Sequence, residues 1–245
     1  MPSHDDTLTR LAREFVVRDI MIPVSDLVCA AGTPEAVELL DRYSDFDMIP
    51  LVAQDSLTAY LERGGSGPRP LRMSDLVSDA TSILDIVDIL TDRPRVFVLV
   101  RNRIGGYVHF SDLNRPIVKL PFFVLLEAVE RRFFDMLSGV ITSQLIETVL
   151  GQKRRANLET RMRRQQASGS NLNWAALLGF KELLLCAREL GALASEVGDL
   201  DRLAKVRNLV CHAANEDLLV EQHSDVRRLA HAKSLCFKLL KDTAP

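Results

Sequence analysis

An internal repeat constrains the fold of this chain more than any other feature of its sequence. Residues 50–52 (PLV), a polar gap and residues 57–61 (LTAYL) recur 47 positions later as residues 97–99 (FVL) and 104–108 (IGGYV). In each copy the two apolar runs flank a polar triplet that is compatible with a turn, which predicts a β-hairpin. The sequence therefore predicts two related hairpins.

Each predicted hairpin is preceded by a stretch with helical spacing. Apolar residues recur at intervals of three and four in residues 36–40 and again in residues 83–90. Because Thr33 precedes Pro34, we expect Thr33 to cap the first helix and Pro34 to occupy its first position. Residues 96–100 are continuously apolar, which predicts a strand that is covered on both faces, and hence helices over the sheet.

The remainder of the chain predicts helices only. A connector rich in glycine and proline at residues 63–70 separates the two copies, and strand signals stop after Pro116. Amphipathic patterns then predict helices at residues 121–137, 142–164, 174–193, 200–211 and 225–240. The predicted fold class is α+β, with tandem βαββα units at residues 1–116 and an all-α helical bundle at residues 117–245.

Composition narrows the class of protein. A length of 245 residues allows two domains of roughly 100–150 residues, and the formal net charge of −2 predicts no general affinity for polyanions. No apolar run reaches the roughly 18–20 residues that span a bilayer, and the N-terminus lacks the pattern of a secretory signal. The scattered cysteines suit a reducing compartment and lack the spacing of a zinc site. We therefore expect a cytoplasmic protein with no membrane partner and no metal.

The second copy ends in a run that resembles the nucleotide signature of CBS motifs. Residues 106–112 (GYVHFSD) match the family pattern of a glycine, two apolar residues, a Thr or Ser, two further residues and an Asp. His109 occupies the place of the Thr or Ser. With two α/β units in tandem, the chain resembles a CBS pair, or Bateman module. The resemblance implies that an adenine nucleotide (AMP, ADP or ATP) or S-adenosylmethionine regulates the protein, bound by Gly106, His109, Ser111 and Asp112.

The chemistry of these residues fits such a ligand. The glycine lets backbone approach the ligand, the Asp112 carboxylate accepts bonds from two ribose hydroxyls, and a helix starting at Ser111 presents N–H groups to phosphate. The His109 ring N–H contacts phosphate, more strongly when protonated, or His109 is simply a strand-edge residue. Asp112 is equally a helix N-cap.

The first copy does not keep this pattern. Ala59, Glu62 and Gly65 stand where the second copy has its glycine, histidine and aspartate. One nucleotide site, rather than two, is therefore expected.

A second resemblance lies near the end of the predicted helix at residues 200–211. Arg207 and Asn208, followed by His212, resemble the signature of HEPN ribonucleases, in which an Arg, often followed by a polar residue, is separated from a His by four to six residues. Family members are helical and typically dimeric, with two motifs facing each other across a cleft. The resemblance implies a homodimeric endoribonuclease that needs no metal or catalytic cofactor and leaves 2′,3′-cyclic phosphates on RNA.

These residue types suit RNA cleavage. Asn208 and His212 share a helix face, and Arg207 reaches round on its long stem. His212 would move a proton, Arg207 would stabilise the charge of the phosphorane, and Asn208 would orient either group. Alternatively, Arg207 pairs with Asp201 or Glu216, and His212 is a cation favoured at a helix C-terminus.

Basic residues gather in two further places. One run holds RNA phosphates or forms a solvated helix face, and it comprises Lys153, Arg154, Arg155, Arg161, Arg163 and Arg164. A second set, expected near the nucleotide site, comprises Arg95, Arg101, Arg103 and Arg115. The sequence predicts a nucleotide-regulated endoribonuclease of a stress or phage-defence type. The alternative is a non-catalytic nucleotide sensor whose helical domain dimerises or docks a partner.

Overall fold

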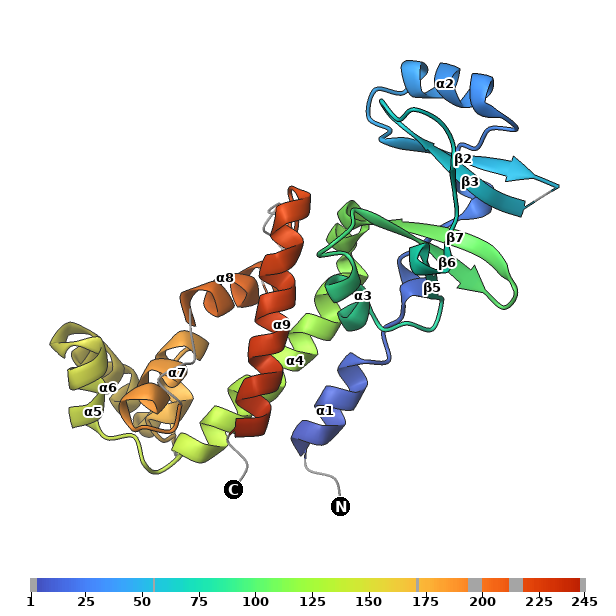
Figure 1. Ribbon diagram of the computed structural model, residues 1–245. Helices are drawn as coiled ribbons and strands as arrows, with labels where there is room; N and C mark the ends of the chain where they lie inside the picture. Colours follow the sequence, from blue (N-terminus) through green and yellow to red (C-terminus); the bar gives the residue numbers. More distant parts are fainter. Residues whose placement is uncertain (1–3, 55, 171, 194–199, 212–217, 243–245) are drawn as a thin grey trace. The chain divides into compact units, whose positions relative to one another are not determined.

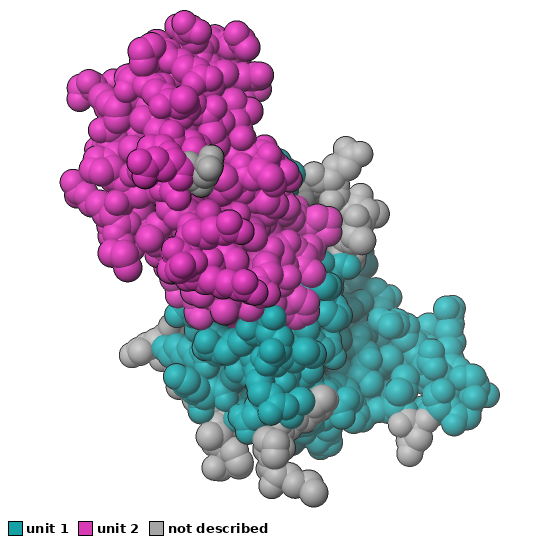
Figure 2. All heavy atoms as spheres, turned by 90° about the vertical axis from the view of Figure 1, so that its right-hand side faces the viewer, with its two compact units in different colours: residues 1–14, 119–219, 227–245 teal, residues 15–118, 220–226 magenta. Residues whose placement is uncertain are grey.

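The chain forms a mixed α+β structure with two compact units. The computed structural model describes residues 4–54, 56–170, 172–193, 200–211 and 218–242 (Figure 1). Residues 15–118 and 220–226 form one unit, here the repeat unit, and residues 1–14, 119–219 and 227–245 form the other, the helical unit (Figure 2). Within the described ranges, no helix is both long enough and apolar enough to cross a membrane.

The repeat unit contains short strands and short helices, with 3-10 helices labelled η. In chain order they are η1 (Val17–Asp19), β1 (Ile22–Pro23), η2 (Val24–Asp26), α2 (Thr33–Arg42), β2 (Met48–Ala53), β3 (Ser56–Glu62), β4 (Arg69–Pro70), η3 (Met73–Asp75), β5 (Leu76–Ser78), α3 (Ile83–Ile89), β6 (Arg95–Val100), β7 (Arg103–His109), η4 (Phe110–Asn114) and η6 (His223–Asp225). Both predicted hairpins are confirmed, as β2–β3 and β6–β7.

The two hairpins match each other in backbone detail. The pairing register shifts after Leu51 in the first hairpin and after Val98 in the second, 47 residues later. Each turn holds one residue with positive φ, Gln54 at 51° and Arg101 at 59°, at the same offset. The repeat in the sequence is therefore a repeat of the backbone, including its irregularities.

The two copies exchange their first strands. In β1, Ile22 pairs with Tyr107 of the second hairpin, and in β4, Arg69 pairs with Tyr60 of the first hairpin. Each partner in one pair lies 47 residues from its counterpart in the other. The exchange produces sheets with strand orders β1-β7-β6-β5 and β2-β3-β4, so each sheet contains strands from both copies.

Buried helices and aromatic rings close the core of the repeat unit. Val96, Phe97 and Val98 in β6 are at most 2% exposed, which confirms that both faces of this strand are covered. The Phe97 ring lies 5.8 Å from that of Tyr60 and 5.6 Å from that of Tyr107, so it joins the two hairpins. These contacts position the surfaces between the two copies.

The predicted cap of α2 is wrong by one residue. Gly32 precedes the helix in an extended conformation, and Thr33 is the first helical residue. The Glu35 carboxylate accepts the Ala31 N–H at 2.7 Å, so a side chain from inside the helix satisfies the backbone ahead of it.

The described residues of the helical unit form helices and no strand. The helices are α1 (His4–Ala12), α4 (Pro116–Leu137), α5 (Ser143–Leu150), α6 (Gln152–Ala167), η5 (Ala175–Leu177), α7 (Phe180–Glu189), α8 (Leu200–Cys211) and α9 (Val226–Asp242). The single helix predicted at residues 142–164 is two helices, because Gly151 between them adopts φ 85°. The helix predicted at residues 174–193 begins as η5 and continues, after a break, as α7.

The units do not correspond to a single cut of the chain at residue 116. The first helix belongs to the helical unit, where the Arg13 guanidinium lies 5.1 Å from the centre of the Phe237 ring. Residues 220–226 belong to the repeat unit, because the Asn114 side chain binds the backbone of Val220. The chain therefore passes between the units more than once.

Candidate functional site: a pocket between the two repeats

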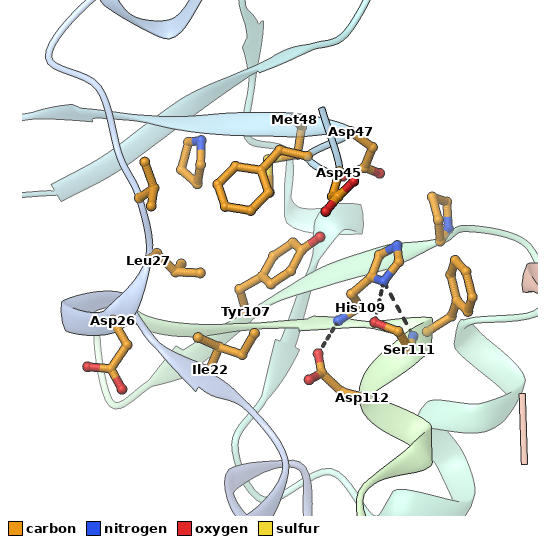
Figure 3. Close-up of a pocket in the computed structure, with 15 residues that line it drawn as sticks. Ile22, Asp26, Leu27, Asp45, Asp47, Met48, Tyr107, His109, Ser111 and Asp112 are labelled. Carbon is orange, nitrogen blue, oxygen red and sulfur yellow. Dashed lines mark hydrogen bonds between the residues drawn. The ribbon is translucent and has the colours of Figure 1, made fainter. Parts of the chain in front are cut away.

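A pocket of about 500 Å³ lies between the two copies of the repeat (Figure 3). It is lined from the first copy by Ile22, Asp26, Leu27, Val28, Asp45, Phe46, Asp47, Met48 and Pro50, and from the second by Pro94, Tyr107, His109, Phe110, Ser111 and Asp112. Three residues predicted to bind a nucleotide thus line one cavity, and Gly106 does not. The walls are largely apolar, with one group of polar residues at the end of β7 and aspartates from the first copy elsewhere in the lining.

The Asp112 carboxylate is buried at the start of η4, with 8% of the residue exposed. One carboxylate oxygen accepts the His109 backbone N–H at 2.8 Å, and the other accepts Nε of Arg115 at 3.1 Å. The alternative of Asp112 as N-cap is wrong, because His109 is the N-cap of η4 and Asp112, inside the turn, accepts its backbone N–H. Since Asp112 also lines the pocket, its remaining lone pairs are available to a ligand.

His109 and Ser111 satisfy each other. Nδ1 of His109 lies 2.8 Å from the Ser111 hydroxyl and accepts the Ser111 backbone N–H at 3.3 Å. Burial lowers the pKa of His109, and this effect outweighs the nearby carboxylates of Asp47 and Asp112, which raise it. His109 is therefore neutral at pH 7, and protonation would require a more acidic solution.

Gly106 is required by packing against β1, outside the pocket lining. A Cβ atom at this position would lie 2.7 Å from Sδ of Met21 and 3.0 Å from the carbonyl oxygen of Ile22. The sequence analysis expects this glycine to let a ligand come close to the backbone. In the structure, the chain at Met21 and Ile22 comes close to the Gly106 backbone instead.

The pocket is acidic. Four carboxylates line it, and none of the described residues of its lining is a lysine or an arginine; the four are Asp26, Asp45, Asp47 and Asp112. Beyond the lining, Arg95 pairs with Asp47 and Arg115 pairs with Asp112. In the part of the chain that the structure describes, neither Asp26 nor Asp45 forms an ion pair.

The basic set expected near the nucleotide site is divided. Arg95 and Arg115 lie beside the pocket, because they pair with the lining residues Asp47 and Asp112. The expectation is wrong for Arg101 and Arg103, which lie at the turn of the second hairpin, at the opposite end from His109, and line a separate hollow with Arg18.

The pocket has a counterpart related to it by the repeat, in which arginine side chains form part of the lining. This second pocket is smaller, about 300 Å³, and Arg95 stands in it at the position that Met48 holds in the first. The Arg95 guanidinium pairs with Glu62 and lies 5.5 Å from the centre of the Tyr60 ring. Arg69 also pairs with Glu62, at 2.6 Å. Three arginines, Arg69, Arg93 and Arg95, thus form part of the lining of the second pocket, and the expectation of a single nucleotide site stays a prediction.

A segment from the end of the chain lies against the wall of the first pocket. The Asn114 side chain donates to the Val220 carbonyl oxygen at 2.7 Å and accepts the Val220 N–H at 2.9 Å. Nε2 of His223 donates to the Leu90 carbonyl oxygen at 2.6 Å, and its ring lies 5.5 Å from that of Phe110. We call residues 220–226 the strap. Its contacts join residues more than one hundred positions apart, so a local sequence pattern could not have predicted them.

In the helical unit, α8 carries part of the predicted ribonuclease set. Arg207 has 30% of its side chain exposed and lies 3.8 Å from the Glu130 carboxylate of α4. Its Nε is buried and, within the described ranges, has no hydrogen-bond partner. Asn208 is exposed. His212 lies outside the described residues.

The ion pairs proposed as the alternative for Arg207 are different in the structure. Asp201 pairs with Lys181 at 2.5 Å, so it is not the partner of Arg207. Glu216 lies outside the described residues. Burial raises the pKa of Glu130, and the charge of Arg207 opposes this effect.

The basic run on α6 is divided between paired and exposed side chains. Arg154 pairs with Glu182, Arg155 with Glu147 and Arg163 with Glu159. Lys153, Arg161 and Arg164 are exposed and, among described residues, form no ion pair. These three share one helix face, since α-helical geometry places them within about 80° of one another.

No protein-family model and no curated protein sequence matches the chain. Among solved structures, the CBS domain of the bacterial CNNM/CorC family Mg²⁺ transporter in complex with ATP is similar, with a TM-score of 0.36 and 14% identity, covering 48% of this chain and 94% of that chain. The CBS domain of the bacterial CNNM/CorC family Mg²⁺ transporter in complex with the inhibitor IGN95a gives a TM-score of 0.34 at 14% identity, covering 49% and 86%. Similarity at this level does not decide the function of the chain.

Proposed function

We propose that the repeat unit binds one adenine nucleoside or nucleotide in the acidic pocket, and that occupancy regulates the helical unit. The observation that carries this proposal is the pocket itself, which both copies build with apolar walls and a buried carboxylate, Asp112, at one end. Its volume falls within the range of about 300–1,000 Å³ that small-molecule sites occupy. A planar base fits beside Phe46 and Tyr107, and ribose hydroxyls have an acceptor in Asp112.

Two covalent connections leave the pocket wall for the helical unit. The turn η4 lines the pocket with Phe110, Ser111 and Asp112 and leads directly into α4. The strap, held by Asn114 on the same turn, leads directly into α9. A ligand that prefers one position of η4 would therefore shift the equilibrium of both helices.

For the helical unit we propose metal-independent RNA cleavage by a homodimer, with Arg207, Asn208 and His212 in the roles given by the HEPN resemblance. The specific observation in favour is that Asn208 is exposed and the neighbouring Arg207 side chain is 30% exposed, so a phosphate could reach both side chains. The exposed face of α6 formed by Lys153, Arg161 and Arg164 supports contact with an RNA backbone.

Two measurements test these roles separately. Calorimetric titration with AMP, ADP, ATP and S-adenosylmethionine is expected to give one site per chain in the wild type and much weaker binding in Asp112→Ala. RNA incubated with the protein in a metal chelator is expected to acquire 2′,3′-cyclic ends, which Arg207→Ala and His212→Ala abolish, while DNA stays intact because it lacks the 2′-hydroxyl. Cleavage that survives both substitutions, or no cleavage at all, would favour a helical unit that dimerises or docks a partner.

A further inference from the structure

The pocket offers a ligand many acceptors and few donors. Figure 3 shows Asp45 and Asp47 near the Tyr107 hydroxyl and His109, with Asp26 across the cavity. The groups expected to hold phosphate are used within the chain. The Ser111 N–H donates to Nδ1 of His109.

A second backbone donor at this end is also engaged, whereas the neutral His109 ring keeps its Nε2–H as a donor, because Nδ1 is an acceptor. The His109 backbone N–H donates to Asp112. A nucleotide phosphate placed here would meet carboxylates without a guanidinium, an ammonium or a free backbone N–H in the described lining to receive it. Phosphate sites in proteins are built from those donors. The geometry of the pocket therefore disfavours a polyphosphate tail.

We infer that the pocket selects an adenosyl compound whose 5′ substituent is cationic over nucleotides with a free polyphosphate. This inference rests on the proposed function and names the class of ligand for the same site. Base and ribose lie between the apolar walls and Asp112, and the cationic substituent extends toward the unpaired carboxylate of Asp45. A unit charge about 8 Å from such a carboxylate, at an effective dielectric constant of about 20, changes affinity roughly 30-fold before screening by salt.

The arginines at residues 69 and 95 distinguish the counterpart from this pocket. Arg95 and Arg69 already supply the positive charge in the second pocket, where Glu62 binds both. In the first pocket Met48 and Ile22 hold the positions equivalent to these two arginines. Asp47 and Asp112 are paired with arginines behind the lining, so Asp26 and Asp45 are the carboxylates left for a cation of the ligand.

Two ligands that differ by one methyl group and one charge isolate the effect. S-adenosylmethionine carries a sulfonium cation, and S-adenosylhomocysteine carries the neutral thioether. We expect isothermal titration of the full chain to give at least tenfold tighter binding of the sulfonium compound. ATP in a chelator is expected to bind more weakly than either compound.

A pair of variants locates the charge preference. Asp45→Asn is expected to reduce the preference for the sulfonium compound severalfold and to strengthen ATP binding. Asp45 is exposed and bonds only to the Ser44 hydroxyl among described residues, so folding should be unaffected. Asp41→Asn makes the same charge change on the exposed face of α2, away from the pocket lining, and should leave both affinities unchanged.

The outcomes separate this inference from the proposed function. If ATP binds more tightly than the sulfonium compound and Asp112→Ala abolishes that binding, the site stands and the charge preference is wrong. If the two adenosyl compounds bind equally, or if Asp45→Asn and Asp41→Asn behave alike, the inference is also overturned. If no adenosyl compound binds, the proposed function fails with it.

Discussion

Replacing Asp112 with alanine removes two roles that can be measured apart. The structural role is the cap of η4, in which the carboxylate accepts the His109 N–H and Nε of Arg115. Loss of such a cap costs about 1 kcal/mol, and the half-exposed ion pair adds at most about 0.5 kcal/mol. For a chain of this size the expected fall in melting temperature is about 2–6 °C.

The binding role has a larger expected magnitude. If two ribose hydroxyls donate to the Asp112 carboxylate, their loss weakens affinity roughly 10–100-fold, since charge-assisted bonds contribute about 1.5–3 kcal/mol. A ligand at 100 times its wild-type Kd stabilises the wild type by about 2.7 kcal/mol and a tenfold weaker variant by about 1.4 kcal/mol. Thermal denaturation with and without ligand therefore shows a ligand shift that is halved or smaller in Asp112→Ala.

Asp19→Ala is the matched control for the stability loss. Asp19 caps η1 by accepting the Val16 N–H at 3.1 Å, and it does not line the pocket. We expect Asp19→Ala to lower the melting temperature to a similar extent while keeping the full ligand shift. An undiminished ligand shift in folded Asp112→Ala would refute the assignment of this carboxylate to the ligand.

Three further predictions concern the same unit. Gly106→Ala should lower the free energy of unfolding by about 1–3 kcal/mol, because the new Cβ collides with Met21. Urea denaturation measures this free energy, and a value equal to that of the wild type would contradict the prediction. Burial lowers the pKa of His109 in the folded chain, so the unfolded chain binds more protons. Stability therefore falls as the pH drops from about 6.5, the pKa of a histidine in an unfolded chain, toward the lower pKa of His109 in the folded chain. His109→Asn should remove this component from denaturation curves recorded between about pH 5 and pH 7.5, and an unaltered pH slope would count against it. Asn114→Ala should speed hydrogen exchange at Val220, since it removes both bonds to the strap, and should weaken ligand-induced protection in α9 more than it weakens ligand binding itself.

The repeat made the hairpins predictable, but it did not reveal how the copies are joined. Turn chemistry and apolar runs are local, so β2–β3 and β6–β7 follow directly from the sequence. The exchanged strands β1 and β4 have two residues each, and the partner of β1 lies in the other copy, far away in the chain. Strands this short carry no usable alternation, so the pairing of Ile22 with Tyr107 became evident only from the structure.

The candidate site was predictable where it depends on one segment of sequence. His109, Ser111 and Asp112 lie together because they are neighbours in the chain. Asp45 and Asp47 were missed because they precede β2 in the other copy, and only the exchange of strands brings them to the cavity. The one sequence signal that could have indicated Asp45 and Asp47 is the repeat offset of 47 residues, because it aligns each residue of one pocket with a residue of the other.

Divergence between the copies places ligand contact and the strap on the same turn. The residues equivalent to η4 in the first copy are 63–67, the start of the glycine-rich connector, where the structure has no helical turn. In the second copy this turn became η4, which supplies Asp112 to the pocket and Asn114 to the strap. A small movement of this five-residue turn would therefore change both the pocket lining and the contact with the strap. The equivalent residues of the first copy do not form such a turn. An asymmetric pair of this kind needs only one bound ligand to change the strap, which is why a single intact pocket is sufficient for the proposed regulation.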